Sequence, residues 1–138
     1  MHLRLAIDYG AATVRAVLVS PGGVTVLPLD GVEDMSTAVH VGDTGVVTGA
    51  AAWRQAAGNP DGFVLSPLRA GTGQVLAGGV QAEVVDLVAA TLRQVAVAAQ
   101  AAAGEPIEDV RLVVPAGWGP RRQQTVTSPP GPGVIPTG

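Results

Sequence analysis

Three short apolar segments, separated by turn signals, open the chain and limit the folds that it can adopt. Residues 3–8 alternate apolar and polar or small side chains, and residues 14–20 and 24–27 are rich in valine and leucine. Such runs are typical of β-strands. Tight connections are predicted at residues 9–12 and at the Pro-Gly-Gly of residues 21–23. The pattern predicts that the chain begins with an antiparallel meander of three strands.

Beyond the meander, the pattern predicts a mixture of short elements and one long helix. The middle of the chain is predicted to hold a loop, two short strands, a short helix and a longer loop, over residues 30–37, 38–41, 45–48, 50–57 and 58–79. Apolar side chains recur at helical spacing over residues 80–103, which predicts an amphipathic helix ended by Gly104 and Pro106. Residues 110–114 are then predicted to be a buried strand. The fold class is therefore α/β, with helices packed on a mixed sheet.

Composition excludes several classes of protein. The net charge of −3 and the pI of about 5.1 argue against nucleic-acid binding, and the adjacent Arg121 and Arg122 are too few to reverse this. The absence of cysteine excludes disulfides, thiolate metal sites and cysteine nucleophiles. Asp8 interrupts the N-terminal apolar run, and Asp86 and Arg93 interrupt the long helix. We therefore expect a cytoplasmic protein without a signal peptide or membrane span.

The C-terminal segment differs in composition from the rest of the chain. Residues 126–138 contain four prolines and three glycines, which disfavour a helix or a central strand. We therefore expect a folded domain over residues 1–125 and a disordered tail over residues 126–138. All basic residues are arginine, and the chain is rich in alanine, glycine and valine. This bias is typical of GC-rich coding sequences, such as those of actinobacteria.

Several segments resemble, in order and at similar spacing, the seventy-kilodalton heat-shock chaperones of the DnaK type, which belong to the actin-like ATPase superfamily. Residues 5–13 (LAIDYGAAT) resemble the first phosphate loop of that family, IGIDLGTTNS. The other matching segments are GAAAWRQA at 49–56 followed by Asn59-Pro60, LSPLR at 65–69, VVPA at 113–116 and RQQT at 122–125. Together they span residues 3–125.

The resemblance implies a fold and a site. The fold would be the first subdomain of an actin-like ATPase, which is ribonuclease H-like. Its phosphate loop would comprise Asp8, Gly10, Ala11, Ala12 and Thr13, with ATP as the ligand. Asp8 would help to hold magnesium, which prefers a few carboxylates and water, and backbone amides beside Gly10 would face the phosphates.

Departures from the family pattern predict a loss of activity. Two family threonines that contact the phosphates are replaced by Ala11 and Ala12, and a methyl group donates no hydrogen bond. The family lysine near the γ-phosphate is replaced by Trp53. We therefore expect no catalytic residue and no ATP hydrolysis by this chain alone. Pro115 and Arg122 match positions that couple the nucleotide state to a substrate domain.

Three interpretations of the function remain open from the sequence. The chain could be a degenerate part of a nucleotide-binding domain that binds ATP weakly or not at all, with a missing second lobe as its partner. It could instead be a non-enzymatic protein-interaction module of an actinobacterial accessory protein, for example one associated with type VII secretion. It could also be a truncated gene product. A lone lobe would expose the face that packs on its partner lobe, so self-association is expected.

Overall fold

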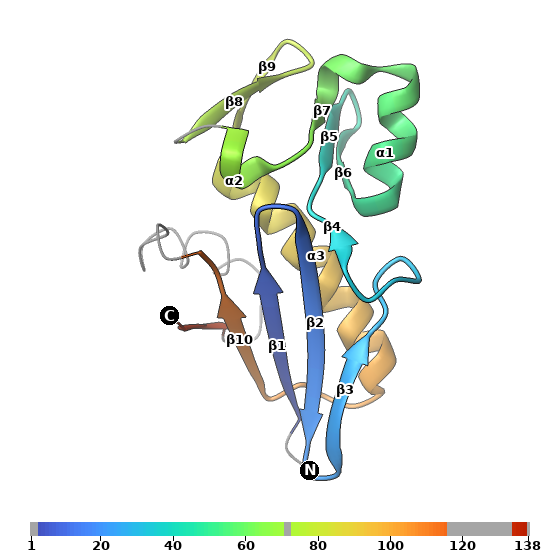
Figure 1. Ribbon diagram of the computed structural model, residues 1–138, viewed down its shortest axis with the longest axis vertical. Coiled ribbons are helices and arrows are strands. Elements are labelled where there is room, and N and C mark those ends of the chain that lie inside the picture. The colour runs from blue at the N-terminus through green and yellow to red at the C-terminus, as the bar shows by residue number, and fades with distance from the viewer. Residues whose placement is uncertain (1–2, 71–72, 116–133, 138) are drawn as a thin grey trace.

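A mixed sheet forms the larger part of the molecule. The computed structural model describes residues 3–70, 73–115 and 134–137 of the 138-residue chain. The sheet has the order β11-β10-β1-β2-β3, and β1, β2 and β3 form an antiparallel meander while β10 lies parallel to β1 (Figure 1). The strands are β1 (Arg4–Tyr9), β2 (Thr13–Ser20), β3 (Gly23–Leu27), β10 (Asp109–Val113) and β11 (Val134–Thr137). The predicted meander and the mixed α/β class are confirmed.

The prediction of a disordered tail is wrong for its last strand. Val134–Thr137 forms β11, which pairs parallel with β10. Proline is tolerated on an edge strand because half of the amides of such a strand face away from the sheet. Residues 126–133 and Gly138, which complete the predicted tail, lie outside the described residues.

The long helix α3 (Val84–Ala103) begins four residues later than predicted. Residues 80–83 instead form β9 (Val80–Glu83), which pairs with β8 (Gln74–Ala77). Gly78 and Gly79 make the turn with φ angles of 58° and 77°, a conformation that glycine adopts without a steric cost. Gly104 ends α3 in the left-handed conformation, as the sequence predicts.

A smaller group of elements lies beyond the upper end of the sheet. The predicted short strands are present as β5 (Val39–Gly42) and β6 (Gly45–Thr48), and the short helix is α1 (Gly49–Gly58). The two predicted loops contain further short elements, which are β4 (Met35–Ser36), a 3₁₀ turn (Pro60–Gly62), β7 (Phe63–Val64) and α2 (Pro67–Ala70). β5 pairs with both β6 and β7, whereas β4 pairs with β2.

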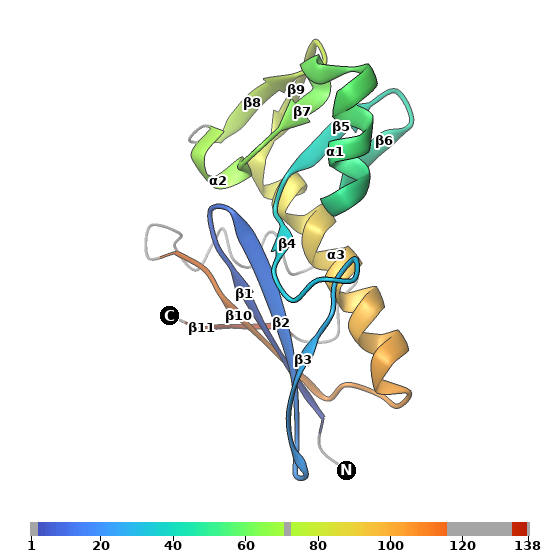
Figure 2. The ribbon, with the colours of Figure 1, turned by 45° about the vertical axis from the view of Figure 1, so that its right-hand side comes forward.

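Helix α3 connects two hydrophobic clusters. Figure 2 shows α3 running along one side of the sheet and continuing upward to β8 and β9. Val84 and Val88 belong to the main cluster between α3 and the sheet, whereas Leu87 belongs to a smaller cluster with Val39 and Val64. By length and mean hydropathy (1.3), α3 could also cross a membrane, but most of its buried residues belong to the main cluster between the helix and the sheet.

Candidate functional site

The loop between β1 and β2 contains most of the residues that the sequence assigns to a phosphate site. The backbone N–H of Gly10 donates to the carbonyl oxygen of Thr13 at 2.9 Å, which closes the loop. A Cβ at Gly10 would lie 3.3 Å from that oxygen, so glycine suits this tight position. Ala12 and Thr13 are exposed, and Ala11 is half-buried.

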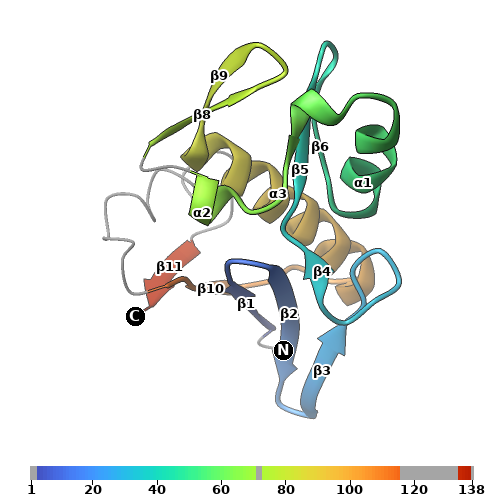
Figure 3. The ribbon, with the colours of Figure 1, turned by 45° about the horizontal axis from the view of Figure 1, so that its top comes forward.

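Hydroxyl and amide groups from distant segments hold this loop in place. The Thr37 hydroxyl donates to the Ala11 carbonyl at 3.2 Å, and the Thr37 amide donates to the Ala12 carbonyl at 3.0 Å. The Ser66 hydroxyl also donates to the Ala11 carbonyl. Figure 3 shows the loop facing β4 and α2, from whose neighbourhoods these groups come. Within the described residues, the Ala11 and Ala12 amides have no acceptor, so they are available to an anion.

Trp53 reaches the same region from α1. Its indole Nε1 donates to the Ser36 hydroxyl at 3.1 Å, and its ring meets Phe63 edge to face, with 4.9 Å between the centroids. Ser36 lies on β4 directly opposite Thr13. Trp53 is nonetheless 51% exposed. Trp53 is therefore an indole anchored by Ser36, which pairs with Thr13 at the end of the β1–β2 loop, and by Phe63.

The position of α1 depends on an aspartate cap. Thr48 makes no side-chain cap at the start of the helix. The Asp30 carboxylate instead accepts a hydrogen bond from the Ala50 amide at 3.0 Å, 20 residues away in sequence. A carboxylate at a helix N-terminus satisfies a free amide and interacts favourably with the helix dipole.

Asp8 lies on the face of the sheet away from α3. It is exposed, and its register neighbours are Arg15 on β2 and Val113 on β10. Arg15 makes a two-pronged contact with Asp34 at 2.8 and 2.9 Å, and this hydrogen-bonded pair lowers the pKa of Asp34 and raises the pKa of Arg15. The cation beside Asp8 on β2 is therefore already engaged by another carboxylate.

A buried phenol lies directly before the loop. Tyr9 is only 1% exposed, and burial raises the pKa of its hydroxyl well above the usual value. The hydroxyl lies near Thr37, which moderates that rise, but no atom of the described residues meets hydrogen-bond geometry with it. The neutral phenol thus contributes packing, not charge, to the base of the site.

These residues fit a magnesium–ATP ligand poorly. The Ala11 and Ala12 amides could face a phosphate, but the side chains of these residues donate nothing, and the Trp53 N–H is used by Ser36. In the described part of the chain, no three His, Cys, Asp or Glu side chains converge to hold a metal ion. A lone Asp8 would leave most of the coordination of a magnesium ion to water.

The structure brings together the sequence-predicted residues 10–13 and Trp53, and it leaves Asp8 on the open face of the sheet. It also identifies Thr37 and Ser66 as the residues that hold the loop, and Ser36 as the residue that anchors Trp53, roles that sequence reasoning missed. Their separations of 26 residues (Thr37 to Ala11) and 55 residues (Ser66 to Ala11) carry no periodic signal. Pro115 is exposed just after β10, and Arg121 and Arg122 lie outside the described residues.

A hollow lies by the β5–β6 hairpin. It has a volume of about 280 Å³ and is lined by residues that include His40, Asp43 and Asn59. His40 is buried, and its Nε2 donates to the Asn59 carbonyl at 2.7 Å. His40 therefore has a structural partner. His2, the other histidine, lies outside the described residues.

No protein-family model matches the chain, and no curated protein matches it. The geometry around the β1–β2 loop and α1 therefore carries the functional proposal.

Proposed function

We propose that this chain is a degenerate nucleotide-binding subdomain of the DnaK-like, actin-like ATPase type, working in the cytoplasm. It binds magnesium–ATP weakly or not at all, and it does not hydrolyse ATP. The observation that carries the proposal is the position of Trp53. Helix α1 holds this residue beside the β1–β2 loop through Ser36, where the sequence resemblance expects the lysine of an active ATPase.

The order of the strands supports the proposed fold family. A three-strand antiparallel meander is followed, after α3, by β10 lying parallel to β1. The sequence resemblance implies this arrangement for the first subdomain of an actin-like ATPase. The tight β1–β2 loop lies at the end of the central strands, as a phosphate loop of that family would.

The chemistry of the site accounts for the proposed loss of activity. Phosphoryl transfer depends on positioning and on neutralising the charge that develops on the transferred group. Trp53 offers one N–H and no positive charge, and that N–H already donates to Ser36. The loss of one such stabilising group typically costs about 3 kcal/mol of transition-state stabilisation.

Calorimetry on the full chain tests this proposal. We expect magnesium–ATP to give no measurable binding heat, or a Kd of about 1 mM or weaker, with the unmodified chain. The triple variant Ala11→Thr, Ala12→Thr, Trp53→Lys should bind at least about tenfold more tightly, because it restores two hydroxyls and a cation. A matched control carries Ala11→Thr, Ala12→Thr and Gln55→Lys, which adds the same charge two residues along α1.

Each result has a defined meaning. Binding that improves in the triple variant but not in the control would support an inherited phosphate site. Tight binding by the unmodified chain would contradict the proposal, because it would mean that the loop holds nucleotide without the family's side chains. A phosphate-release assay on the unmodified chain should show no turnover.

A non-enzymatic interaction module is the second candidate function. The observation that favours it is that the loop and Trp53 are held by internal contacts to Thr37, Ser36 and Phe63. None of these contacts requires a ligand. If neither the unmodified chain nor the triple variant binds magnesium–ATP, this candidate replaces the first.

A further inference from the structure

The sheet has one face packed against α3 and one face, called the open face below, that none of the described elements covers. Leu5, Ile7 and Leu112 point towards α3 and are buried in the main hydrophobic cluster. The alternate residues Arg4, Asp8 and Arg111 are exposed on the other side. Figure 1 shows α3 behind the sheet and none of the described elements in front of β1, β2 and β3.

Four valines form a contiguous patch on this open face, which we call the valine block. Val17 lies directly opposite Val26, and Val19 directly opposite Val24, on the neighbouring strands β2 and β3. Val24 is 68% exposed, and the other three are half-buried. Side chains opposite each other on antiparallel strands lie about 5 Å apart, so the block presents one continuous apolar surface.

A charged group continues the same two rows of the sheet. Asp109, Arg4 and Val19 are register neighbours in one row, and Arg111, Ala6 and Val17 in the next. Asp109 lies 3.7 Å from Arg4 and 3.6 Å from Arg111, measured between its Oδ2 and each Nε. Both arginine side chains are at least half exposed. These three side chains therefore place both negative and positive charge beside the valine block.

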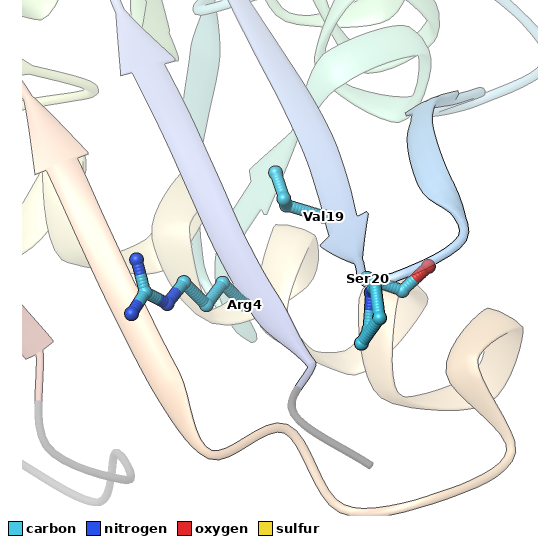
Figure 4. A pocket seen from close by; sticks show the side chains of 4 residues that line it. Arg4, Val19 and Ser20 are labelled. Carbon is cyan, nitrogen blue, oxygen red and sulfur yellow. The ribbon is translucent and has the colours of Figure 1, made fainter.

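A shallow hollow lies beside the row that contains Arg4 and Val19, next to the turn between β2 and β3. It has a volume of about 270 Å³ and is lined by Arg4, Val19, Ser20 and Pro21. Figure 4 shows the Arg4 side chain extending across the sheet on this face, with Val19 and Ser20 on the neighbouring strand. The open face thus has an apolar area, a hollow and a charged group within a few residues of one another.

We propose that this open face is a self-association surface on which a second copy of the chain packs sheet against sheet. The two copies are related by a two-fold axis that lies between their sheets. This axis places the first row of each copy over the second row of the other copy, and the two rows are complementary in this arrangement. Such an axis places Val24 over Val26 of the second copy and Val19 over its Val17. It also places Asp109 opposite Arg111 of the second copy, and the reverse. An isologous interface requires this kind of self-matching patch.

The charge pattern favours a second copy over a partner that carries charges of one sign. An acidic partner would face Asp109, and a basic partner would face Arg4 and Arg111. A second copy offers an acid to Arg111 and a base to Asp109 at once. The β-branched side chains of the valine block also suit face-to-face sheet packing, in which side chains of two sheets interdigitate.

Analytical ultracentrifugation of the full chain over a range of concentrations tests the proposal, and it does not depend on nucleotide binding. We expect a reversible monomer–dimer equilibrium. Val24→Asp should weaken the dimer at least about tenfold, because it buries a charge in the apolar part of the interface. Val97→Asp is the matched control, since Val97 is 71% exposed on α3 and should leave the dimer unchanged. Far-UV circular dichroism verifies that both variants are folded.

A charge exchange provides a second, independent test. Arg111→Glu should weaken the dimer, because the introduced carboxylate would then face Asp109 of the second copy. Adding Asp109→Arg to the same chain should restore much of the lost affinity, because the two charges are then exchanged. A chain that sediments as a monomer at every concentration would overturn the proposal. So would a dimer that Val24→Asp and Val97→Asp affect equally, or one that the exchange does not restore.

Discussion

At the scale of single residues, the backbone conformation and tight packing of Gly49 determine where α1 begins. Gly49 has a φ of 61°, and a Cβ there would lie 2.3 Å from the Asp30 carboxylate and 2.9 Å from the Met35 sulfur. We expect Gly49→Ala to destabilise the chain by about 2–3 kcal/mol, because it strains the backbone and displaces the Asp30 cap. Urea unfolding measures this change.

Gly58, at the other end of α1, is the matched control for Gly49. Nothing lies within 4 Å of a Cβ built there, and its φ is not left-handed. Gly58→Ala should therefore leave the stability unchanged or raise it slightly. Equal losses in the two variants would show that the Asp30 cap and the tight packing at Gly49 have no special role.

At the scale of elements, burial of one face of α3 determines how the helix packs. Val88 is completely buried, whereas Val97 is 71% exposed on the same helix. We expect Val88→Ala to destabilise the chain by about 2 kcal/mol, from lost burial and the cavity that remains. Val97→Ala should change the stability by less than about 0.5 kcal/mol. Thermal unfolding followed by circular dichroism compares them, and similar effects of both would contradict this orientation of the helix.

At the scale of the whole molecule, α3 joins the sheet to the smaller group of elements. Leu87 packs in the smaller cluster, and its neighbour Val88 packs in the main cluster. We therefore expect one cooperative unfolding transition. In the variant Trp118→Phe, Trp53 is the remaining tryptophan and reports on the smaller group through its contact with Phe63. Its fluorescence and far-UV circular dichroism should give the same urea midpoint.

The outcome that would contradict this cooperativity is a fluorescence transition at lower urea than the dichroism transition. The smaller group would then unfold while the sheet remained intact. Leu87→Ala should lower both midpoints together if α3 couples the two clusters. It should lower only the fluorescence midpoint if it does not.

Local sequence patterns predicted much of this fold, because strands, turns and helix ends depend mainly on residues that are close in sequence. Alternation at Leu3, Leu5 and Ile7 and the turn at residues 21–23 were sufficient for the meander. Gly104 was sufficient to end α3. The start of α3 was misplaced because residues 80–83 continue the apolar pattern of the helix, and only pairing with β8 makes them a strand. The strand β11 was missed because proline content disfavours a central strand, whereas β11 lies at an edge.

The sequence by itself determined the strands of the meander, the amphipathic helix and the absence of hydroxyl and lysine groups at Ala11, Ala12 and Trp53. These are properties of residue type and short-range spacing. Only the tertiary structure decided which groups hold the β1–β2 loop, because Thr37 and Ser66 approach it across long separations in sequence. It also decided which face of the sheet stays open. That depends on where α3 packs, because β2 and β3 carry apolar side chains on both faces and do not by themselves select the covered one.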